Sequence, residues 1–276
     1  MGYQIKVVLV FALLSFFGIF IYFSINESGS EAFRSKTEER PSELFGPSVE
    51  LHNPFIITRL RNELMHLPSE NGYQLSQSDH LYDPSMGQSK AILKALDYKT
   101  RGFFIECGAL DGETRSNTLY MERSLNWSGI LIEGDPKNFE LLKKKNRRAH
   151  SFPVCLSPFP YPEILLFEQQ FNIGKITDTA KSNTVQVECY PLSYILLAVN
   201  QTSIDYFSLD VEGNELKVLK NVPWDNVDIK TLSVEFVHDK EGKVAIKEYM
   251  ESVGYDLIDE ISRDDMLAND FIFLKR

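Results

Sequence analysis

Residues 103–117 read FFIECGALDGETRSN, and this stretch decides the fold. The apolar run that precedes Glu106 has the continuous hydrophobicity of a parallel strand covered on both faces. Gly108 and Gly112 then allow the backbone to turn sharply at the carboxyl end of that strand. In open α/β sheets, ligands bind in the crevice at this end. The stretch predicts a ligand-binding loop or, because the same glycine spacing occurs in plain tight turns, a turn alone.

A second acid favours the binding loop. An apolar strand over 129–132 ends in Glu133. The acid follows the loop by about twenty residues, the separation at which a carboxylate meets the ribose hydroxyls of a bound nucleotide. We therefore expect Glu106 and Glu133 to stand at neighbouring strand ends and to face one pocket with a glycine floor.

Strand and helix patterns alternate through the middle of the chain. Thr114 or Ser116 can cap a helix after the glycine loop, and Asp135 with Pro136 is typical of the cap and first residue of the next helix. Such alternation indicates a parallel sheet. Further strands are predicted at 152–156, 204–210 and 231–237.

The flanking regions also carry helix and strand patterns. A helix is predicted over 55–67, and Ser85 with Gln88 forms a capping-box pattern for a helix through Ile92. A helix over 242–253 should stop at Gly254. The segments 255–261 and 270–274 then predict a closing hairpin.

The chain resembles the FkbM-type methyltransferases in four stretches. These are GALDGETRSN at 108–117, ERSLNWSGILIEGDPKNFELLKKKNR at 122–147, YFSLDVEGNELKVLKNV at 206–222 and LSVEFVH at 232–238. Together with YDPSMGQSKAIL at 82–93, they are similar to the branch that contains the membrane protein Star. The resemblance covers roughly 54–276. It implies a Rossmann-like, mostly parallel seven-stranded sheet with helices on both faces, and S-adenosylmethionine as the cofactor for methylating hydroxyl groups.

The resemblance also assigns cofactor-binding residues. Glu133 would bind the ribose. Ser116 and Asn117 open the following helix, where free N–H groups could meet the cofactor carboxylate, although both residues could instead only cap the helix. Three residues match the first cofactor motif and would hold the methionine part and the turn beneath it: Glu106, Gly108 and Gly112.

Acidic residues at two later strand ends are candidates for catalysis. Asp210 ends an apolar strand and Glu212 follows it. Asp210 could contact the methionine amine, or act as a base that removes the acceptor proton, and Glu212 is the second catalytic candidate. Alternatively, both could cap the helix over 214–220. Glu235 and His238 should lie near the same edge, but mixed carboxylates at unfixed spacing do not define a metal site, and none is predicted.

The amino-terminal region predicts a membrane anchor. Residues 7–25 are uncharged and contain fourteen Leu, Ile, Val or Phe residues, enough to cross a bilayer. A cleaved signal peptide is the alternative. We expect a cytoplasmic tail over 1–6, a signal anchor over 7–25, a flexible stem over 26–49 and the methyltransferase-like domain over 50–276. The sequons at Asn26, Asn126 and Asn200 are compatible with a lumenal domain.

The net charge limits the kinds of partner that the chain can bind, and the cysteines raise the question of a disulfide. A net charge of −10 argues against nucleic acid, which requires a basic footprint. The basic run at 143–148 is interpreted as the solvated end of a helix. Cys107, Cys155 and Cys189 are interpreted as buried thiols, with one bridge open to an oxidising lumen.

Two functional hypotheses follow. One is a membrane-anchored methyltransferase that acts on a hydroxyl group. The other, implied by the Star resemblance, is a non-catalytic binding module that assists the export of EGF-receptor ligand precursors from the endoplasmic reticulum to the Golgi and endosomes. S-adenosylmethionine is charged and is made in the cytosol, so a lumenal domain would need a transporter for activity, whereas a cytosolic one would favour the enzyme.

Overall fold

The computed structural model describes residues 44–265 and 267–276. The predicted tail and membrane anchor, and the stem as far as residue 43, lie outside them. Within the described ranges no helix has the length and apolar character needed to cross a bilayer. Phe45–Arg276 forms one compact unit, which begins earlier than residue 50. The ring of Phe45 packs against Tyr190 with centroids 5.9 Å apart, and the Gly46 N–H donates to the Pro162 carbonyl.

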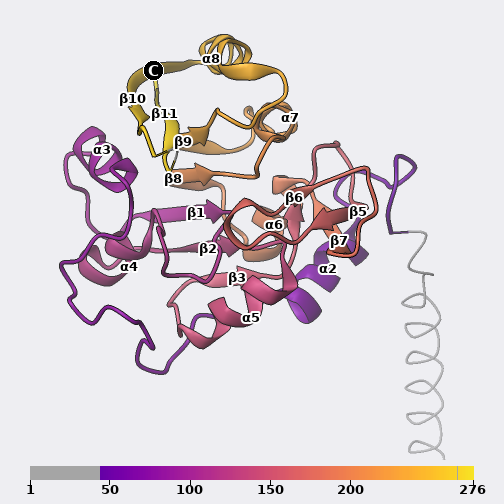
Figure 1. Cartoon of the computed structure of the whole chain (residues 1–276). Helices are drawn as coiled ribbons and strands as arrows, with labels where there is room; N and C mark the ends of the chain where they lie inside the picture. The colour runs from indigo at the N-terminus through magenta and orange to yellow at the C-terminus, as the bar shows by residue number, and fades with distance from the viewer. Residues whose placement is uncertain (1–43, 266) are drawn as a thin grey trace, which may run out of the picture. The chain divides into compact units, whose positions relative to one another are not determined.

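A seven-stranded sheet is the centre of this unit (Figure 1). Its strand order is β10-β11-β9-β8-β1-β2-β3. All neighbours are parallel except β11, which runs antiparallel to both β9 and β10. The mostly parallel sheet and the closing hairpin are thereby confirmed. The strands are β1 (Phe103–Cys107), β2 (Ser128–Ile132), β3 (His150–Phe152), β8 (Ser203–Leu209), β9 (Asp228–Glu235), β10 (Tyr255–Ser262) and β11 (Asn269–Lys275).

Helices cover both faces of the sheet. One face carries α3 (Gln88–Ala95), α4 (Leu119–Leu125) and α5 (Pro136–Lys144), whose apolar side chains share a core with Phe104 and Leu131. From β1 to β3 the chain adds strands on one side of β1, and with β8 it begins to add strands on the other side. Because crossovers are right-handed, this change of direction places α6 (Leu192–Val199), α7 (Glu215–Lys220) and α8 (Gly242–Ser252) on the other face. As predicted, the Asp135 side chain caps α5 by accepting from the Lys137 N–H.

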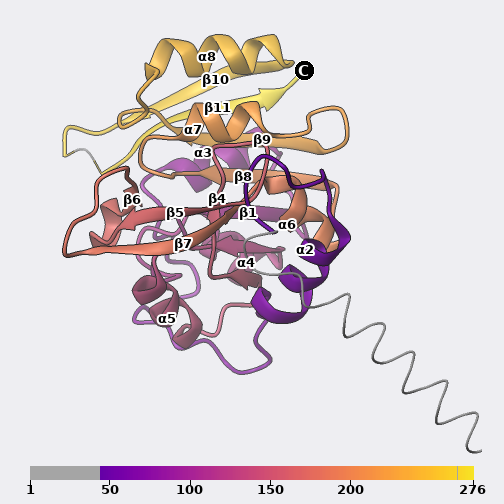
Figure 2. The same ribbon diagram turned by 90° about the vertical axis from the view of Figure 1, so that its right-hand side faces the viewer.

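A second, four-stranded sheet was missed by the sequence analysis (Figure 2). Its order is β4-β7-β5-β6. The predicted strand over 152–156 is wrong, because Pro153 lacks an N–H group and the chain leaves β3 there for the second sheet. The strands are β4 (Cys155–Leu156), β5 (Glu163–Glu168), β6 (Lys175–Ile176) and β7 (Thr184–Tyr190).

The predicted helix over 55–67 is shorter than expected. It consists of α2 (Pro54–Arg59) and one π-helical segment, η2 (Leu60–Leu64). His66 is drawn into an antiparallel bridge with Ser151 at the edge of β3, and this ends the helix. The Ser85 and Gln88 pattern is close to the structure: the Ser85 hydroxyl accepts from the Ser89 N–H at 3.3 Å, and the Gln88 side chain accepts from the Met86 N–H at 3.0 Å.

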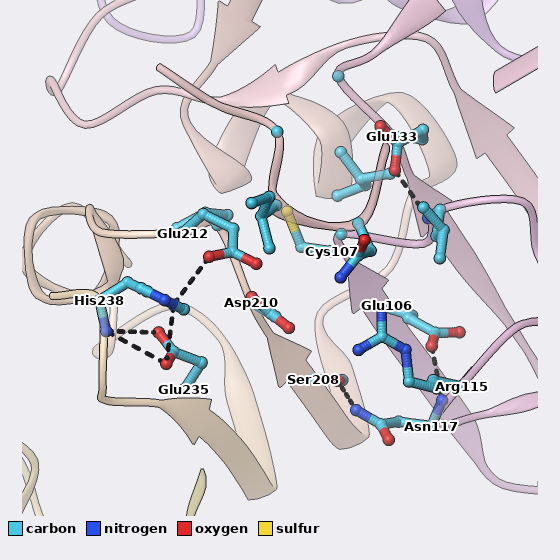
Figure 3. A pocket seen from close by; sticks show the side chains of 18 of the residues that line it. Glu106, Cys107, Arg115, Asn117, Glu133, Ser208, Asp210, Glu212, Glu235 and His238 are labelled. Carbon is cyan, nitrogen blue, oxygen red and sulfur yellow. Dashed lines mark hydrogen bonds and ion pairs between the residues drawn. The ribbon is translucent and has the colours of Figure 1, made fainter. Parts of the chain in front are cut away.

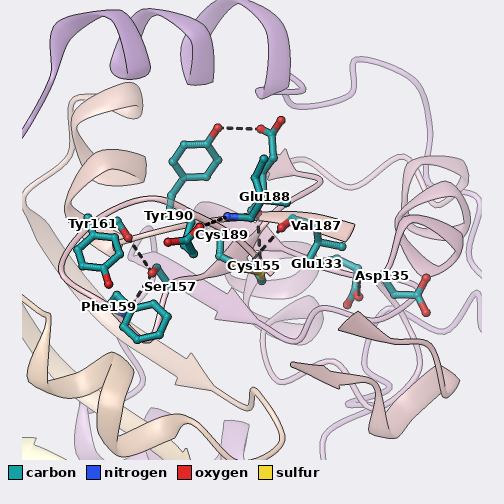
Figure 4. Close-up of a disulfide and its surroundings, with 12 residues drawn as sticks. Glu133, Asp135, Cys155, Ser157, Phe159, Tyr161, Val187, Glu188, Cys189 and Tyr190 are labelled. Atoms are coloured by element: carbon teal, nitrogen blue, oxygen red, sulfur yellow. Dashed lines mark hydrogen bonds between the residues drawn. A yellow bond between two sulfur atoms is a disulfide. The ribbon is translucent and has the colours of Figure 1, made fainter. Parts of the chain in front are cut away.

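A disulfide joins Cys155 and Cys189 (Figure 4). The two residues are register partners on the parallel strands β4 and β7, with Cα atoms 4.4 Å apart. The default interpretation as buried thiols is therefore wrong for these two and holds for Cys107, which is free and buried, and the alternative of one bridge is confirmed. Spacing could not reveal the pair, because it depends on a sheet that the sequence did not predict.

Candidate functional site

A cavity of about 340 Å³ lies at the carboxyl ends of the central strands (Figure 3). This is where open α/β sheets bind ligands. Glu106 and Glu133 both line it, as expected, whereas Gly112 and Ser116 are not among its lining residues. The other predicted site residues that line the cavity are Gly108, Asn117, Asp210 and Glu212, together with Glu235 and His238.

Gly108 allows the glycine loop to approach the end of β8. Its φ is +82°, and a Cβ atom there would lie 2.2 Å from the Asp210 carbonyl oxygen. The Asp210 N–H in turn donates to the Cys107 carbonyl at 3.2 Å. Any side chain at this position would force the two strand ends apart, so the glycine fixes the floor of the cavity.

Glu106 holds the loop from beneath. Its buried carboxylate accepts from the Ser116 hydroxyl at 2.8 Å, the Asn117 N–H at 2.7 Å and the Thr118 hydroxyl. Burial raises the pKa of Glu106, and the charge of Arg147 opposes that rise. The residue ties the end of β1 to the start of α4, so its carboxylate is largely occupied by the protein itself.

Arg147 completes this network and corrects the interpretation of the basic run. The run was expected to be solvated, but the Arg147 side chain is 1% exposed. Its Nε pairs with Glu122 at 3.0 Å, and its two terminal nitrogens donate to the Gly112 carbonyl and to the hydroxyls of Ser116 and Thr118. Arg147 therefore fastens the glycine loop to α4.

The backbone of the helix opening is also occupied. The Asn117 N–H donates to Glu106, and the Ser116 N–H donates to the Glu113 carbonyl at 3.2 Å. The prediction that these N–H groups are free for a cofactor carboxylate is therefore wrong. The capping alternative holds for Ser116, whose hydroxyl accepts from the Leu119 N–H at 3.1 Å.

Glu133 stands just beyond β2 and faces the cavity. Its two oxygens accept from the Leu110 and Asp135 N–H groups, each at 2.7 Å. Burial raises the pKa of Glu133 to about 8. Each carboxylate oxygen can accept a further hydrogen bond, so a ligand hydroxyl could still be bound.

Two buried acceptors in the cavity wall have no donor among the described residues. They are Asn117 Oδ1 and Asp210 Oδ1. The amide nitrogen of Asn117 donates to the Ser208 hydroxyl at 3.0 Å, which fixes its oxygen as the unpaired end. Burial and the charge of Asp270 raise the pKa of Asp210. Buried acceptors are costly without partners, so these atoms indicate a ligand that supplies N–H or O–H donors.

The turn after β8 is not capped by Asp210 and Glu212. Instead, Glu215 reaches back and accepts from the Val211 and Gly213 N–H groups. The capping alternative for Asp210 and Glu212 is therefore wrong, because a residue inside α7 performs that role. Glu212 has a φ of +58° and directs its carboxylate to His238 Nδ1 at 2.8 Å.

Three carboxylates crowd together at this edge. One oxygen each from Asp210, Glu215 and Glu235 lies within 4.8 Å of the others. Burial, together with this mutual repulsion, raises the pKa of Glu215 to about 8 and that of Glu235 to about 9. Two of the three already accept backbone N–H groups, from the turns that follow β8 and β9. We therefore assign no metal to the cluster.

The raised pKa values predict that the unliganded protein loses stability as pH rises. Glu133, Glu215 and Glu235 ionise in the unfolded chain near pH 4.5 and in the folded protein near 8 to 9. Their contribution is full below the unfolded pKa and is lost as pH rises through the folded pKa. The free energy of unfolding should fall by at least about 1 kcal/mol between about pH 6 and pH 9.

Urea unfolding at several pH values measures this slope. In the Glu235→Gln variant the side chain at position 235 cannot ionise, so the free energy of unfolding should fall less steeply with pH than in the wild type. An equal dependence of the free energy of unfolding on pH in the two proteins would contradict the raised pKa of Glu235.

Arg115 and an apolar wall were not identified from the sequence. Arg115 lines the cavity with a φ of +56°. Burial and the charge of Asp210 raise the pKa of Glu212 to about 8, and the charge of Arg115 opposes the rise both there and at Asp210. It is the one Arg or Lys among the described lining residues. The wall comes largely from the second sheet and its loops, at Val154, Cys155, Phe167, Phe171, Ile173 and Ile176. The position of Arg115 within the glycine loop was a signal that could have identified it from the sequence. The apolar wall could not be identified, because it is formed by a sheet that was not predicted.

The sheet order and the crevice at its carboxyl edge define the class: a mixed α/β protein with a mostly parallel sheet and a ligand-sized cavity at its strand ends. The family model of the methyltransferase FkbM domain matches residues 106–257, and the chain belongs to this family. No curated protein matches the chain significantly.

A comparison with solved structures found partial similarities with TM-scores below 0.5. The methyltransferase FkbM from Methylobacillus flagellatus KT is 13% identical with a TM-score of 0.42, over 80% of this chain and 53% of that one. The chain thus spans about half the length of that protein. The METTL16 methyltransferase domain is 12% identical with a TM-score of 0.44, over 83% and 82%. Aeropyrum pernix fibrillarin, in complex with natively bound S-adenosyl-L-methionine, is 12% identical with a TM-score of 0.40, over 64% and 67%.

Proposed function

We propose that the crevice binds S-adenosylmethionine and that the protein transfers its methyl group to a hydroxyl acceptor. The observation that carries the proposal is the pair of buried, unpaired acceptors, Asn117 Oδ1 and Asp210 Oδ1. An ammonium group has three N–H donors and a positive charge, and it would satisfy both atoms. The methionine part of S-adenosylmethionine carries such a group.

Other lining residues suit the remaining parts of the cofactor. Arg115 supplies the cation that the methionine carboxylate needs, in place of the occupied N–H groups of Ser116 and Asn117. Glu133 has lone pairs for the ribose hydroxyls. The apolar wall of Val154, Cys155 and Phe167 lies beyond β2 and β3 and suits an adenine ring. The acidic character of the cavity also favours a cationic sulfonium.

The chemistry of the site follows from these placements. Bound S-adenosylmethionine supplies an electrophilic methyl group. The protein must hold the acceptor hydroxyl in line with that group and receive its proton. Asp210 and Glu212 both line the cavity at the end of β8. In this proposal Asp210 holds the ammonium group, which leaves Glu212 for the acceptor.

Replacing Asp210 with asparagine tests the proposal. We expect the variant to bind S-adenosylmethionine about ten- to a hundredfold more weakly, because a charge-assisted hydrogen bond is lost. Wild-type affinity should rise from about pH 6 to pH 8 as the carboxylate ionises, and the variant should lose this rise. Equilibrium dialysis with radiolabelled S-adenosylmethionine measures both effects. The exposed Asp178→Asn variant is the matched control and should bind as the wild type does. Equal affinity in all three proteins would contradict the proposed ammonium site.

We also propose that residues 7–25 anchor the protein in the membrane and that the folded unit lies in the lumen of the endoplasmic reticulum, Golgi or endosomes. The Cys155–Cys189 disulfide supports a lumenal domain, because such bonds persist in oxidising compartments. Glycosidase treatment of protein made in animal cells should increase its mobility if Asn126 or Asn200 is glycosylated. Protease digestion of intact microsomes gives an independent answer: degradation of the folded unit would contradict a lumenal location.

The same disulfide favours a second candidate function, a Star-like trafficking role. A lumenal domain is separated from cytosolic S-adenosylmethionine, so the fold could serve as a binding module for an EGF-receptor ligand precursor. Deleting the protein should then retain the precursor in the endoplasmic reticulum. Unchanged export would remove this candidate, whereas rescue by Asp210→Asn would show that cofactor binding is dispensable for it.

A further inference from the structure

We propose that His238, oriented by Glu212, takes the proton from the acceptor hydroxyl during methyl transfer. This inference rests on the proposed function and assigns a residue that the FkbM resemblance did not. His238 lies just beyond β9 and lines the same cavity as Glu106 and Asp210 (Figure 3).

The geometry is that of a carboxylate and imidazole pair. His238 Nδ1 lies 2.8 Å from Glu212 Oε2 and 3.3 Å from Glu235 Oε1. A neutral imidazole can donate from only one nitrogen, so a proton on Nδ1 leaves Nε2 as a free acceptor. No described residue supplies a hydrogen bond to Nε2, and the side chain is 42% exposed, so an acceptor hydroxyl can reach it.

The local chain is arranged to bring the pair together. Gly213 has a φ of +113°, and a Cβ atom there would lie 2.8 Å from the His238 carbonyl oxygen. The His238 N–H donates to the Glu235 carboxylate. The turns after β8 and β9 therefore touch through a glycine and a buried carboxylate, which sets Glu212 opposite the imidazole.

The surroundings of His238 favour a neutral imidazole at physiological pH. Burial and the positive charge of Lys175 on β6 lower the pKa of His238. Glu212 and Glu235 face the ring from the two turns, with Asp210 and Glu215 beside them. The pKa values of Glu212 and Glu235 are raised to about 8 and about 9, and on proton transfer the positive charge of the imidazolium would lower them, so that both groups ionise and stabilise the imidazolium.

Methyl transfer breaks one bond in the acceptor and one in the cofactor. The acceptor O–H bond breaks and its proton passes to His238 Nε2. The acceptor oxygen forms a bond to the methyl carbon. The bond between that carbon and sulfur breaks, and its electron pair stays on sulfur, leaving S-adenosylhomocysteine. The imidazolium then releases its proton to solvent through the open mouth of the cavity.

Nuclear magnetic resonance of the full-length protein with ¹⁵N-labelled histidine tests the inference. The nitrogen shifts should show the proton of neutral His238 on Nδ1, and Glu212→Gln should lower the pKa of His238 through loss of the negative charge. The sulfonium should lie beside the ring, so the pKa in the S-adenosylmethionine complex should be about one unit or more below that in the S-adenosylhomocysteine complex. His66, which does not line the cavity, is the internal control and should be unchanged.

The outcomes separate the inference from the function on which it rests. Binding of both ligands with equal His238 pKa values, or a proton on Nε2, would overturn the role of His238 and leave the cofactor site intact. Failure of both ligands to bind would remove the proposed function and the inference with it. A pKa difference confined to His238 supports both.

Discussion

Replacing Gly108 with alanine is expected to abolish cofactor binding and to destabilise the fold by at least about 3 kcal/mol. The added Cβ would lie 2.2 Å from the Asp210 carbonyl oxygen, and backbone cannot move aside as a flexible side chain can. The ends of β1 and β8 would separate, and the two unpaired acceptors would no longer converge. Urea unfolding measures the first effect and equilibrium dialysis the second.

Gly242 provides the matched control for this substitution. Its φ is +85°, close to the +82° of Gly108, but a Cβ atom there would meet nothing within 4 Å. Gly242→Ala therefore carries the conformational penalty alone, about 1 kcal/mol, with normal cofactor binding. Similar losses in the two variants would show that the close approach at Gly108 is unimportant.

Replacing Arg147 with methionine is expected to cost about 3 to 5 kcal/mol, the usual result of stranding one member of a buried ion pair. Glu122 would lose its ion-pair partner in a site where its side chain is 0% exposed. The Gly112 carbonyl would also lose its donor, so the glycine loop should loosen and cofactor affinity should fall with stability. The free energy of unfolding in urea gives the size of the effect.

Lys144→Met is the control for Arg147, because it removes an exposed charge from the same basic run. It should change stability by less than about 0.5 kcal/mol. The double variant Arg147→Met with Glu122→Met removes both buried charges and should recover part of the loss. A single Arg147→Met variant as stable as the Lys144 control would contradict the buried network.

The sequence was sufficient for the central sheet because its signals are local. Continuous apolar runs, the Asp135–Pro136 cap and the glycines at strand ends each follow from short-range chemistry. The second sheet was missed because β4 and β6 are only two residues long and because β4 pairs with β7, which lies 34 residues further along the chain. The disulfide was missed for the same reason, because its cysteines meet only when β4 lies beside β7.

The candidate site was predicted in position more than in detail. Strand-end acids mark the crevice, so Glu106, Glu133 and Asp210 were found together. Whether a carboxylate is free to bind a ligand depends on hydrogen-bond partners from distant parts of the chain, and the sequence alone does not identify those partners. Arg147 illustrates the limit: Lys143 and Lys144 in the same basic run are exposed, and Arg147 is buried only by its packing against α4.

A calorimetric titration of the full-length protein with S-adenosylmethionine tests the central claim most directly. A crevice with an ammonium site, a carboxylate site and a ribose site predicts one bound ligand per chain with a dissociation constant of about 10 µM or below. The absence of binding heat at millimolar ligand, confirmed at a second temperature, would contradict it.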